Sequence, residues 1–305
     1  PDVVKDLVKY GVSFTRNENG DFVYTREGAH AHHRILFHED ITGKEITSHL
    51  LNAVKKLKNV RMYEYNDSLR YPLRWQQVLW WNYQVPDGRE EQVEADYVIL
   101  ATGGIGGTYK HSTNFKHLTG DGVEIARRHN IELKNLDYVQ IHPTTLYSDN
   151  KEERSFLISE SVRGEGARLY DKNMNRFVDE LLPRDLLTQE IYKQMEKDGT
   201  DFVWEDLRTI PRDELISHFP NIIEHCSQAG YDVFHECIPI VPAQHYFMGG
   251  IKVNHNSKTS MDHLYAVGET ACNGVHGKNR LASNSLLESL VFAKRAAKEI
   301  AGERR

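Results

Sequence analysis

The chain has 305 residues, of which 39% are hydrophobic and 27% are charged, and its formal net charge at pH 7 is -6. This composition excludes a disordered or fibrous protein and allows one large or two medium domains. The basic residues are spread along the chain, so no stripe of positive charge favours nucleic acid. The apolar runs are far shorter than the ~20 residues that cross a bilayer, so we expect no membrane span.

The cysteines and the first residues bear on the setting of the protein. Cys226, Cys237 and Cys272 form an odd set without a CxxC pair, which favours free thiols in a reducing compartment and predicts a cytoplasmic protein. The sequence opens with Pro1 and a helix-like stretch over 2–8, without an initiator Met or a signal peptide. We therefore expect the chain to begin inside a longer protein.

The first third of the chain predicts a helix followed by strands. Residues 41–57 carry apolar side chains at helical spacing, namely Ile46, Leu50, Ala53, Val54 and Leu57, which indicates a surface helix. Residues 60–65 alternate between apolar and polar side chains as a strand does, and the Trp-rich stretch from Trp75 to Tyr83 can continue that sheet. No function is assigned to the Trp-rich stretch.

Two short apolar runs end at glycine. Residues 97–101 lead into Gly103 and Gly104, and residues 263–267 lead into Gly268. Runs without alternation are typical of parallel strands covered on both faces, and glycine lets the backbone pass close to a ligand. The pattern predicts an α/β fold with a doubly wound sheet, in which ligands bind at the carboxyl ends of the strands.

The stretch between these runs has a different pattern. Residues 136–247 contain turn signals and short amphipathic helices, for example at 183–195, so we interpret them as an inserted α+β domain that caps the site. From Ser283 onward the sequence predicts a helix with an N-terminal cap and an apolar face. The N-terminus of that helix would present free N–H groups and partial positive charge.

Several polar residues stand beside Gly or Pro, where turns hold side chains in place: His142, Arg163, Glu165, Arg184, His245 and Arg280. Taken singly, each histidine is more often structural and each arginine more often a surface ion-pair partner. Together they provide at least two guanidinium groups and two imidazoles. Because a guanidinium matches a carboxylate bidentately, the set predicts a small dicarboxylate substrate.

Metal and hydrolase chemistry are poorly supported. His30, His32 and His33 lack Cys or carboxylate partners at the spacing of a zinc site, so we assign them structural or surface roles and predict no metal. The G-x-S-x-G turn of many serine hydrolases does not occur in the sequence.

Seven motifs resemble, in order, those of the succinate dehydrogenase, fumarate reductase and L-aspartate oxidase flavoprotein family. They are ATGG at 101–104, TGDG at 119–122, IHPT at 141–144, RGEG at 163–166, PRD at 183–185, HYFMGG at 245–250 and NRLASNSLLE at 279–288. The resemblance implies an FAD-binding domain formed by 1–135 and 248–305 and a capping domain at 136–247. The family's first glycine motif and its C-terminal helical domain have no counterpart here, so the resemblance covers the central part of such a protein.

Details within these motifs favour the oxidases of the family. The segment REGAH at 26–30, the sequence HPTTLY at 142–147 and Ala282 resemble the oxidase pattern. This implies FAD-dependent oxidation of L-aspartate to iminoaspartate for NAD biosynthesis, with oxygen or fumarate as electron acceptor and quinolinate synthase as a partner. A soluble fumarate reductase or succinate dehydrogenase, or a non-catalytic fragment that binds a partner, are the alternatives.

The resemblance also implies roles for individual residues. Arg184 would act as acid and base, Glu27 would lie near the substrate amino group, and His142, Ser159, His245 and Arg280 would hold the substrate carboxylates with Glu160 and Arg163 close by. Residues implied in FAD binding are Asp67, Ser68, Asp121, Glu269, Ser285 and Leu286.

Overall fold

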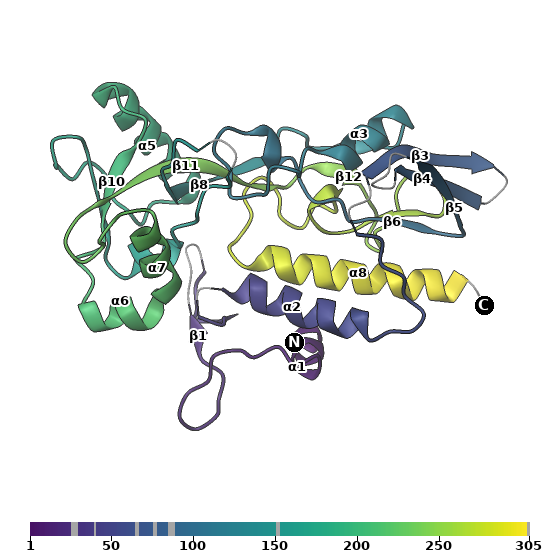
Figure 1. Ribbon diagram of the computed structural model, residues 1–305, viewed down its shortest axis with the longest axis horizontal. Helices are drawn as coiled ribbons and strands as arrows, with labels where there is room; N and C mark the ends of the chain where they lie inside the picture. Colours follow the sequence, from purple (N-terminus) through teal and green to yellow (C-terminus); the bar gives the residue numbers. More distant parts are fainter. Residues whose placement is uncertain are drawn as a thin grey trace.

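The computed structural model describes residues 1–25, 30–39, 41–64, 67–75, 78–84, 89–150 and 153–303, and for 67–75, 78–84, 90 and 303 it describes the backbone alone. The molecule is elongated, with a mixed helix and sheet region at one end and three helices along one side of the other (Figure 1). In the described part of the chain no helix is both long and apolar enough to cross a membrane.

The helices are spread through the whole sequence. They are α1 (Asp2–Lys9), α2 (Thr42–Lys55), α3 (Asp121–Arg128), α4 (Glu160–Gly164), α5 (Arg184–Asp198), α6 (Arg212–His218), α7 (Pro220–Gln228) and α8 (Asn284–Glu303), with 3-10 turns η1 (Gly106–Thr108) and η2 (Gly268–Thr270). The helices predicted from the sequence at 2–8, 41–57, 183–195 and from Ser283 are confirmed as α1, α2, α5 and α8, the last beginning one residue later than Ser283.

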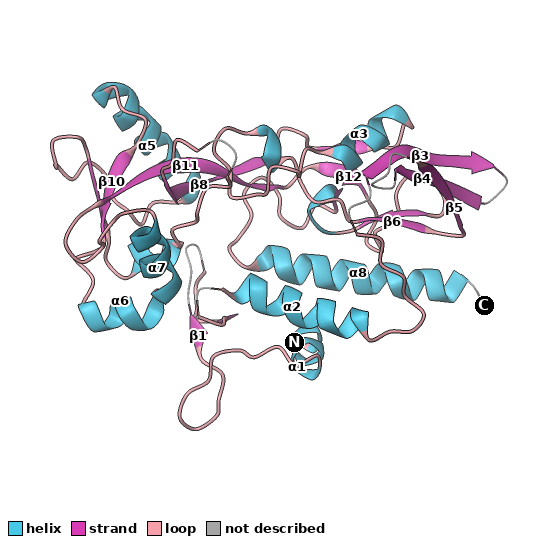
Figure 2. Ribbon diagram, viewed as in Figure 1, coloured by secondary structure: helices cyan, strands magenta, loops and turns pink. Residues whose placement is uncertain are grey.

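The strands are mostly short, and two of them run through the middle of the molecule. They are β1 (Tyr24–Thr25), β2 (Ile35–Leu36), β3 (Asp67–Trp75), β4 (Val78–Gln84), β5 (Glu90–Ala95), β6 (Val98–Leu100), β7 (Leu133–Lys134), β8 (Val139–Leu146), β9 (Arg168–Tyr170), β10 (Val203–Asp206), β11 (Ile238–Phe247), β12 (Gly250–Lys252), β13 (Leu264–Ala266) and β14 (Ala271–Cys272). Figure 2 shows β8 and β11 as the link between the two ends of the molecule.

The two apolar runs that end at glycine pair as parallel strands. β6 and β13 are hydrogen-bonded in parallel, and Leu100, Leu264 and Ala266 share a buried cluster with α3 and β12 residues. This confirms the α/β class. The expectation that both runs are covered on both faces is wrong for β6, because Ile99 is 45% exposed, whereas β13 is buried throughout.

A four-stranded antiparallel sheet of order β8-β11-β10-β9 lies within 136–247. Its core is the largest hydrophobic cluster described and includes Leu169, Leu187 and Ile240. Helix α5 packs on β8 and continues onto β11 and β10. The elements agree with an α+β unit in this stretch, and the domain limits at 136 and 247 stay predictions.

Helices α1, α2 and α8 form a layer on one side of the molecule (Figure 1). Leu7 and Ile46 share a hydrophobic cluster with Leu286 and Leu290 of α8. The apolar face of α8 is therefore partly buried against α1 and α2 near its N-terminus, which holds that terminus in place.

One strand expected from the sequence is not formed. Residues 60–64 form no strand, and Val60, Met62 and Tyr63 are exposed. Alternation stabilises a strand only when a neighbouring strand completes its hydrogen bonds, and β3 begins the sheet at Asp67 instead. The described residues of the Trp-rich stretch, 75 and 78–83, do lie in the antiparallel sheet β3-β4-β5, as expected.

Candidate active site

Two irregularities in the β8–β11 pairing set the direction of the site histidines. Gln244 pairs with Ile141 and Tyr246 pairs with Gln140, so His245 is an extra residue on β11. A second shift, between Val241 and Ala243, places one extra residue on β8, between His142 and Thr145. Because a bulge bends its strand and redirects a side chain, these shifts allow both histidines to leave the regular alternation of the sheet.

The two imidazoles meet edge to face. Their ring centroids are 5.2 Å apart, with 63° between the ring planes. Loss of hydration on burial, together with the charge of Arg184, holds the pKa of His142 well below its usual value. Loss of hydration and the charges of Arg280 and Arg184 do the same to the pKa of His245. Both rings are therefore uncharged at neutral pH and each carries one N–H.

Arg184 stands in the first turn of α5 and forms an ion pair with Glu160. Its Nε donates to Glu160 Oε2 at 2.6 Å, and both side chains are largely buried. A cation at a helix N-terminus opposes the helix dipole, at a cost of about 0.3–1 kcal/mol. The Glu160 carboxylate offsets this cost and orients the guanidinium.

Arg280 approaches the same region from the segment before α8. It is 5% exposed, its guanidinium carbon lies 4.7 Å from the centre of the Tyr246 ring, and its Nη1 donates to Ser285 Oγ at 3.3 Å. The aromatic face and the hydroxyl hold the cation in one orientation. Arg280 thereby brings a guanidinium group to the same region as Arg184 and His245.

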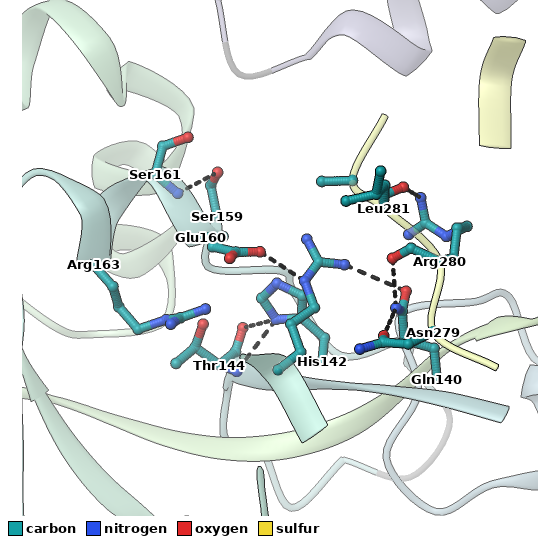
Figure 3. A network of polar contacts seen from close by, with 12 residues as sticks. Gln140, His142, Thr144, Ser159, Glu160, Ser161, Arg163, Asn279, Arg280 and Leu281 are labelled. Carbon is teal, nitrogen blue, oxygen red and sulfur yellow. Dashed lines mark hydrogen bonds and ion pairs between the residues drawn. The ribbon is translucent and has the colours of Figure 1, made fainter. Parts of the chain in front are cut away.

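A residue that the sequence analysis missed joins the two arginines. Gln140 Oε1 accepts from Arg184 Nη1 at 3.4 Å, and its Nε2 donates to Arg280 O and to Asn279 Oδ1, each at 2.8 Å. Figure 3 shows Gln140 between the Glu160 side of the site and the Arg280 segment. Thr113, whose Oγ1 lies 2.8 Å from His245 Nδ1, was also missed. Gln140 stands two residues before His142, so its place on the same strand face was a usable signal.

Ser159 and Arg163 lie on α4 beside this cluster. The Ser159 hydroxyl accepts from Ser161 N and caps the helix. Arg163 is buried, its Nη1 donates to Glu180 O at 2.5 Å, and its charge acts on the pKa of His142. Arg163 therefore acts on His142 through its charge, from a buried position. Ser159 is partly accessible to solvent.

The residues implied in cofactor binding gather at the ends of β6 and β13. Glu269 Oε1 accepts from Phe247 N at 2.8 Å, and burial raises the pKa of Glu269 to about 7. A Cβ on Gly104 would lie 2.4 Å from Glu269 Oε1, so glycine is needed there. Among the described residues no donor meets Glu269 Oε2, which leaves it free to accept from a sugar or ribityl hydroxyl.

Helices α3 and α8 complete this edge. A Cβ on Gly122 would lie 2.2 Å from Thr102 Oγ1 and 2.7 Å from Thr270 Oγ1, so the α3 N-terminus, with Asp121, packs closely on the two strand ends. Ser285 and Leu286 form the first turn of α8, where N–H groups lack intrahelical partners. A buried carboxyl, a glycine pair and a helix N-terminus fit the hydroxyl-bearing chain and the ring of FAD.

Three expected site residues cannot be placed. Glu27 lies outside the described residues, and the side chains of Asp67 and Ser68 do as well. Their roles stay predictions. In the part of the chain that is described, no group of three His, Cys, Asp or Glu side chains could hold a metal ion.

The arrangement is suited to a small doubly charged anion. Arg184, Arg280, His142 and His245 come from four different segments and converge, with Gln140 joining them. Glu160 forms an ion pair with Arg184. Guanidinium groups in a partly buried place attract carboxylates strongly.

The family comparison assigns the fold. The family described as FAD binding domain matches residues 1–286. The chain is 50% identical over 299 residues to an L-aspartate oxidase of Clostridium perfringens and 47% identical over 297 residues to one of Clostridium acetobutylicum, covering 98% and 97% of this chain and 68% of each relative. It also matches the chloroplastic L-aspartate oxidase of Oryza sativa at 38% identity, with 97% of this chain and 49% of the relative covered.

Solved structures give the same answer. A quinol-fumarate reductase described with menaquinol molecules superposes with a TM-score of 0.91 at 31% identity, covering 100% of this chain and 56% of that one. A quinol fumarate reductase of E. coli gives a TM-score of 0.89 at 29% identity, with coverage of 98% and 55%. The chain thus spans about two thirds of the clostridial oxidases and about half of the reductase chains. It belongs to the FAD-binding flavoprotein family that includes the L-aspartate oxidases.

Proposed function

We propose that this chain forms the substrate site and much of the FAD site of an enzyme that oxidises L-aspartate to iminoaspartate. The observation that carries the proposal is the convergence of two arginines and two uncharged imidazoles, joined through Gln140. L-Aspartate has two carboxylates three bonds apart, so a site with cationic and N–H donors from opposite sides can bind both ends. The high identity to named L-aspartate oxidases supports this substrate.

The chain's own residues bind and orient the substrate. Arg280, held by Tyr246 and Ser285, forms a bidentate pair with one carboxylate. His142 and His245 donate N–H groups to the carboxylates without adding charge. With both ends fixed, the C2 hydrogen is presented in one direction, which is the positioning contribution to catalysis. When bound, FAD supplies the oxidant that accepts a hydride from C2.

Fumarate is a second candidate substrate, as the electron acceptor. The structural likeness to quinol-fumarate reductase favours it, and so does the position of Arg184. Reduction of fumarate requires a proton at the carbon next to the one that receives hydride. We assign this proton to Arg184, because Glu160 holds its guanidinium within the converging cluster.

An anaerobic reduction experiment tests the proposal. The chain is loaded with FAD, and bleaching of flavin absorbance is followed after addition of L-aspartate or succinate. We expect L-aspartate to bleach the flavin and the variant Arg280→Leu to lose this response while its FAD content stays unchanged. Bleaching by succinate alone would refute the oxidase assignment and support a dehydrogenase.

A partner enzyme and a cellular compartment follow from this chemistry. Iminoaspartate is an imine that water hydrolyses, so we propose that quinolinate synthase takes it up directly, in the cytoplasm. The described cysteines are free and buried, which agrees with a reducing compartment. The test compares two reactions. With both enzymes in one vessel, the yield of quinolinate per aspartate consumed should be higher than when quinolinate synthase is added after the oxidase reaction has ended.

A further inference from the structure

The loop after η1 holds the bulged segment of β11 at several points. Ser112 Oγ donates to Gln244 Oε1 at 2.6 Å, Thr113 N donates to Gln244 O at 2.9 Å, and Asn114 Nδ2 donates to His245 O at 3.0 Å. A Cβ on Gly106 would lie 2.4 Å from Gln244 Oε1, so the turn needs glycine to approach this closely. The loop therefore fixes the backbone on both sides of the His245 side chain.

Within this loop the Thr113 hydroxyl reaches the His245 ring. Thr113 Oγ1 lies 2.8 Å from His245 Nδ1 and 3.5 Å from Gln244 O. The hydroxyl has one hydrogen to donate. Gln244 O already accepts from Thr113 N at 2.9 Å, and hydrogen bonds weaken at 3.5 Å. Because a hydroxyl can also accept, the alternative has Nδ1–H donating to Thr113 Oγ1 while the hydroxyl hydrogen goes to Gln244 O at 3.5 Å. The 2.8 Å contact offers that hydrogen the better geometry, which favours Nδ1 as the acceptor.

We propose that Thr113 is a positioning residue that fixes His245 as the Nε2–H tautomer. An imidazole whose Nδ1 accepts a hydrogen bond carries its own hydrogen on Nε2. His245 then presents a donor to the space it shares with Arg184 and Arg280. In the opposite tautomer Nε2 would present a lone pair, which repels a carboxylate. The consequence for substrate rests on the proposed function, whereas the tautomer itself does not.

The contrast with His142 makes Thr113 the decisive group. His142 Nδ1 lies 3.0 Å from Thr144 O and 3.2 Å from Thr144 N. The backbone there offers a donor and an acceptor at similar distances, so it does not select one tautomer. At His245 the Thr113 hydroxyl can also donate or accept, but its 2.8 Å contact with Nδ1 is much shorter than its 3.5 Å contact with Gln244 O, and this difference makes the selection.

Nitrogen-15 NMR of histidine-labelled protein tests the tautomer directly, without substrate, and His245→Gln identifies the His245 signals. We expect the wild type and Thr113→Ser to show an unprotonated Nδ1 and a protonated Nε2. Thr113→Val should move the His245 Nδ1 signal toward the protonated value. The matched control is Thr108→Val in η1, which removes a hydroxyl that donates to Ile105 O and should leave the signals unchanged.

Titration with succinate by calorimetry tests the consequence. We expect Thr113→Val to raise the dissociation constant about tenfold, with Thr113→Ser and Thr108→Val close to wild type. A protonated His245 Nδ1 in the wild type would overturn the proposal, and this result does not depend on any variant. Unchanged His245 signals in Thr113→Val would overturn it as well. If the wild type bound no succinate, the dicarboxylate function would fail while the NMR result still decided the role of Thr113.

Discussion

Glu205 gives a sharp test of how burial controls charge in this fold. It lies on β10 with its side chain fully buried, and neither carboxyl oxygen has a hydrogen-bond donor among the described residues. Burial raises its pKa from 4.5 to about 8, although the nearby charge of Arg163 acts in the opposite direction. Glu205 is therefore protonated in the folded protein at pH 7.

The sign and size of the effect follow from proton linkage. The unfolded chain releases this proton near pH 4.5, while the folded protein keeps it to about pH 8. Glu205 therefore destabilises the fold progressively as pH rises from 4.5 to 8. At about 1.4 kcal/mol for each pH unit, the loss is roughly 3 kcal/mol at pH 7 and about 4 kcal/mol at pH 8, where the folded carboxyl is half ionised. Because glutamine cannot ionise, Glu205→Gln should recover most of it.

The measurement is urea unfolding of wild type and Glu205→Gln between pH 5 and 8. The gain in unfolding free energy should be under about 1 kcal/mol at pH 5 and about 3 kcal/mol at pH 7. Glu180→Gln is the control with opposite sign. Glu180 is equally buried, but Arg176 Nη2 donates to it at 2.6 Å and Leu169 N at 3.0 Å, and its pKa is lowered.

Removing the Glu180 charge should destabilise the protein at pH 7, and the difference should fade only as pH falls below 4.5, through the lowered pKa of Glu180. If Glu205→Gln showed a gain independent of pH, or a loss parallel to that of Glu180→Gln, the description of Glu205 as a protonated buried acid would be wrong.

Two further substitutions test the cofactor and proton-transfer assignments. Gly104→Ala should lower FAD affinity at least tenfold in a fluorescence titration, because its Cβ would displace the Glu269 carboxyl, whereas Gly43→Ala, which meets open space on a helix, should leave affinity unchanged. Glu160→Gln removes the ion pair of Arg184 and should lower fumarate turnover about 10²-fold with little change in succinate binding; a parallel loss of binding would instead make Glu160 a substrate ligand.

Local sequence patterns predicted the amphipathic helices, and they predicted the two apolar strands that pair with each other. The periodicity at 41–57 and after Ser283 gave α2 and α8, because an amphipathic face needs only a core to cover it. The alternation at 60–65 failed at 60–64, since a strand requires a partner that local sequence does not specify. Ile99 was expected to be buried, yet the β6–β13 pair leaves it exposed.

The candidate site could be predicted in its residue types and less well in its connections. His142, Arg184, His245 and Arg280 were recognisable because charged or aromatic-polar side chains within three residues of Gly or Pro are unusual in a core. Gln140 was not recognised, because its role depends on hydrogen bonds to two distant segments. Asn279 lies 139 residues further along the chain and Arg184 lies 44 residues further along. Such contacts depend on which distant segments the fold brings together, and local sequence patterns do not show this.

The bulge at His245 explains why the connections matter more than the residue list. In a regular strand, residues 244 and 246 would share one face and His245 would lie on the other. The extra residue breaks that alternation, so the imidazole direction depends on whatever holds the bulge. Here the loop with Ser112, Thr113 and Asn114 holds it. A protein with the same histidine but without this loop would still have an imidazole, but its N–H would not be held in one direction. The loop is therefore part of the site, as the histidine is.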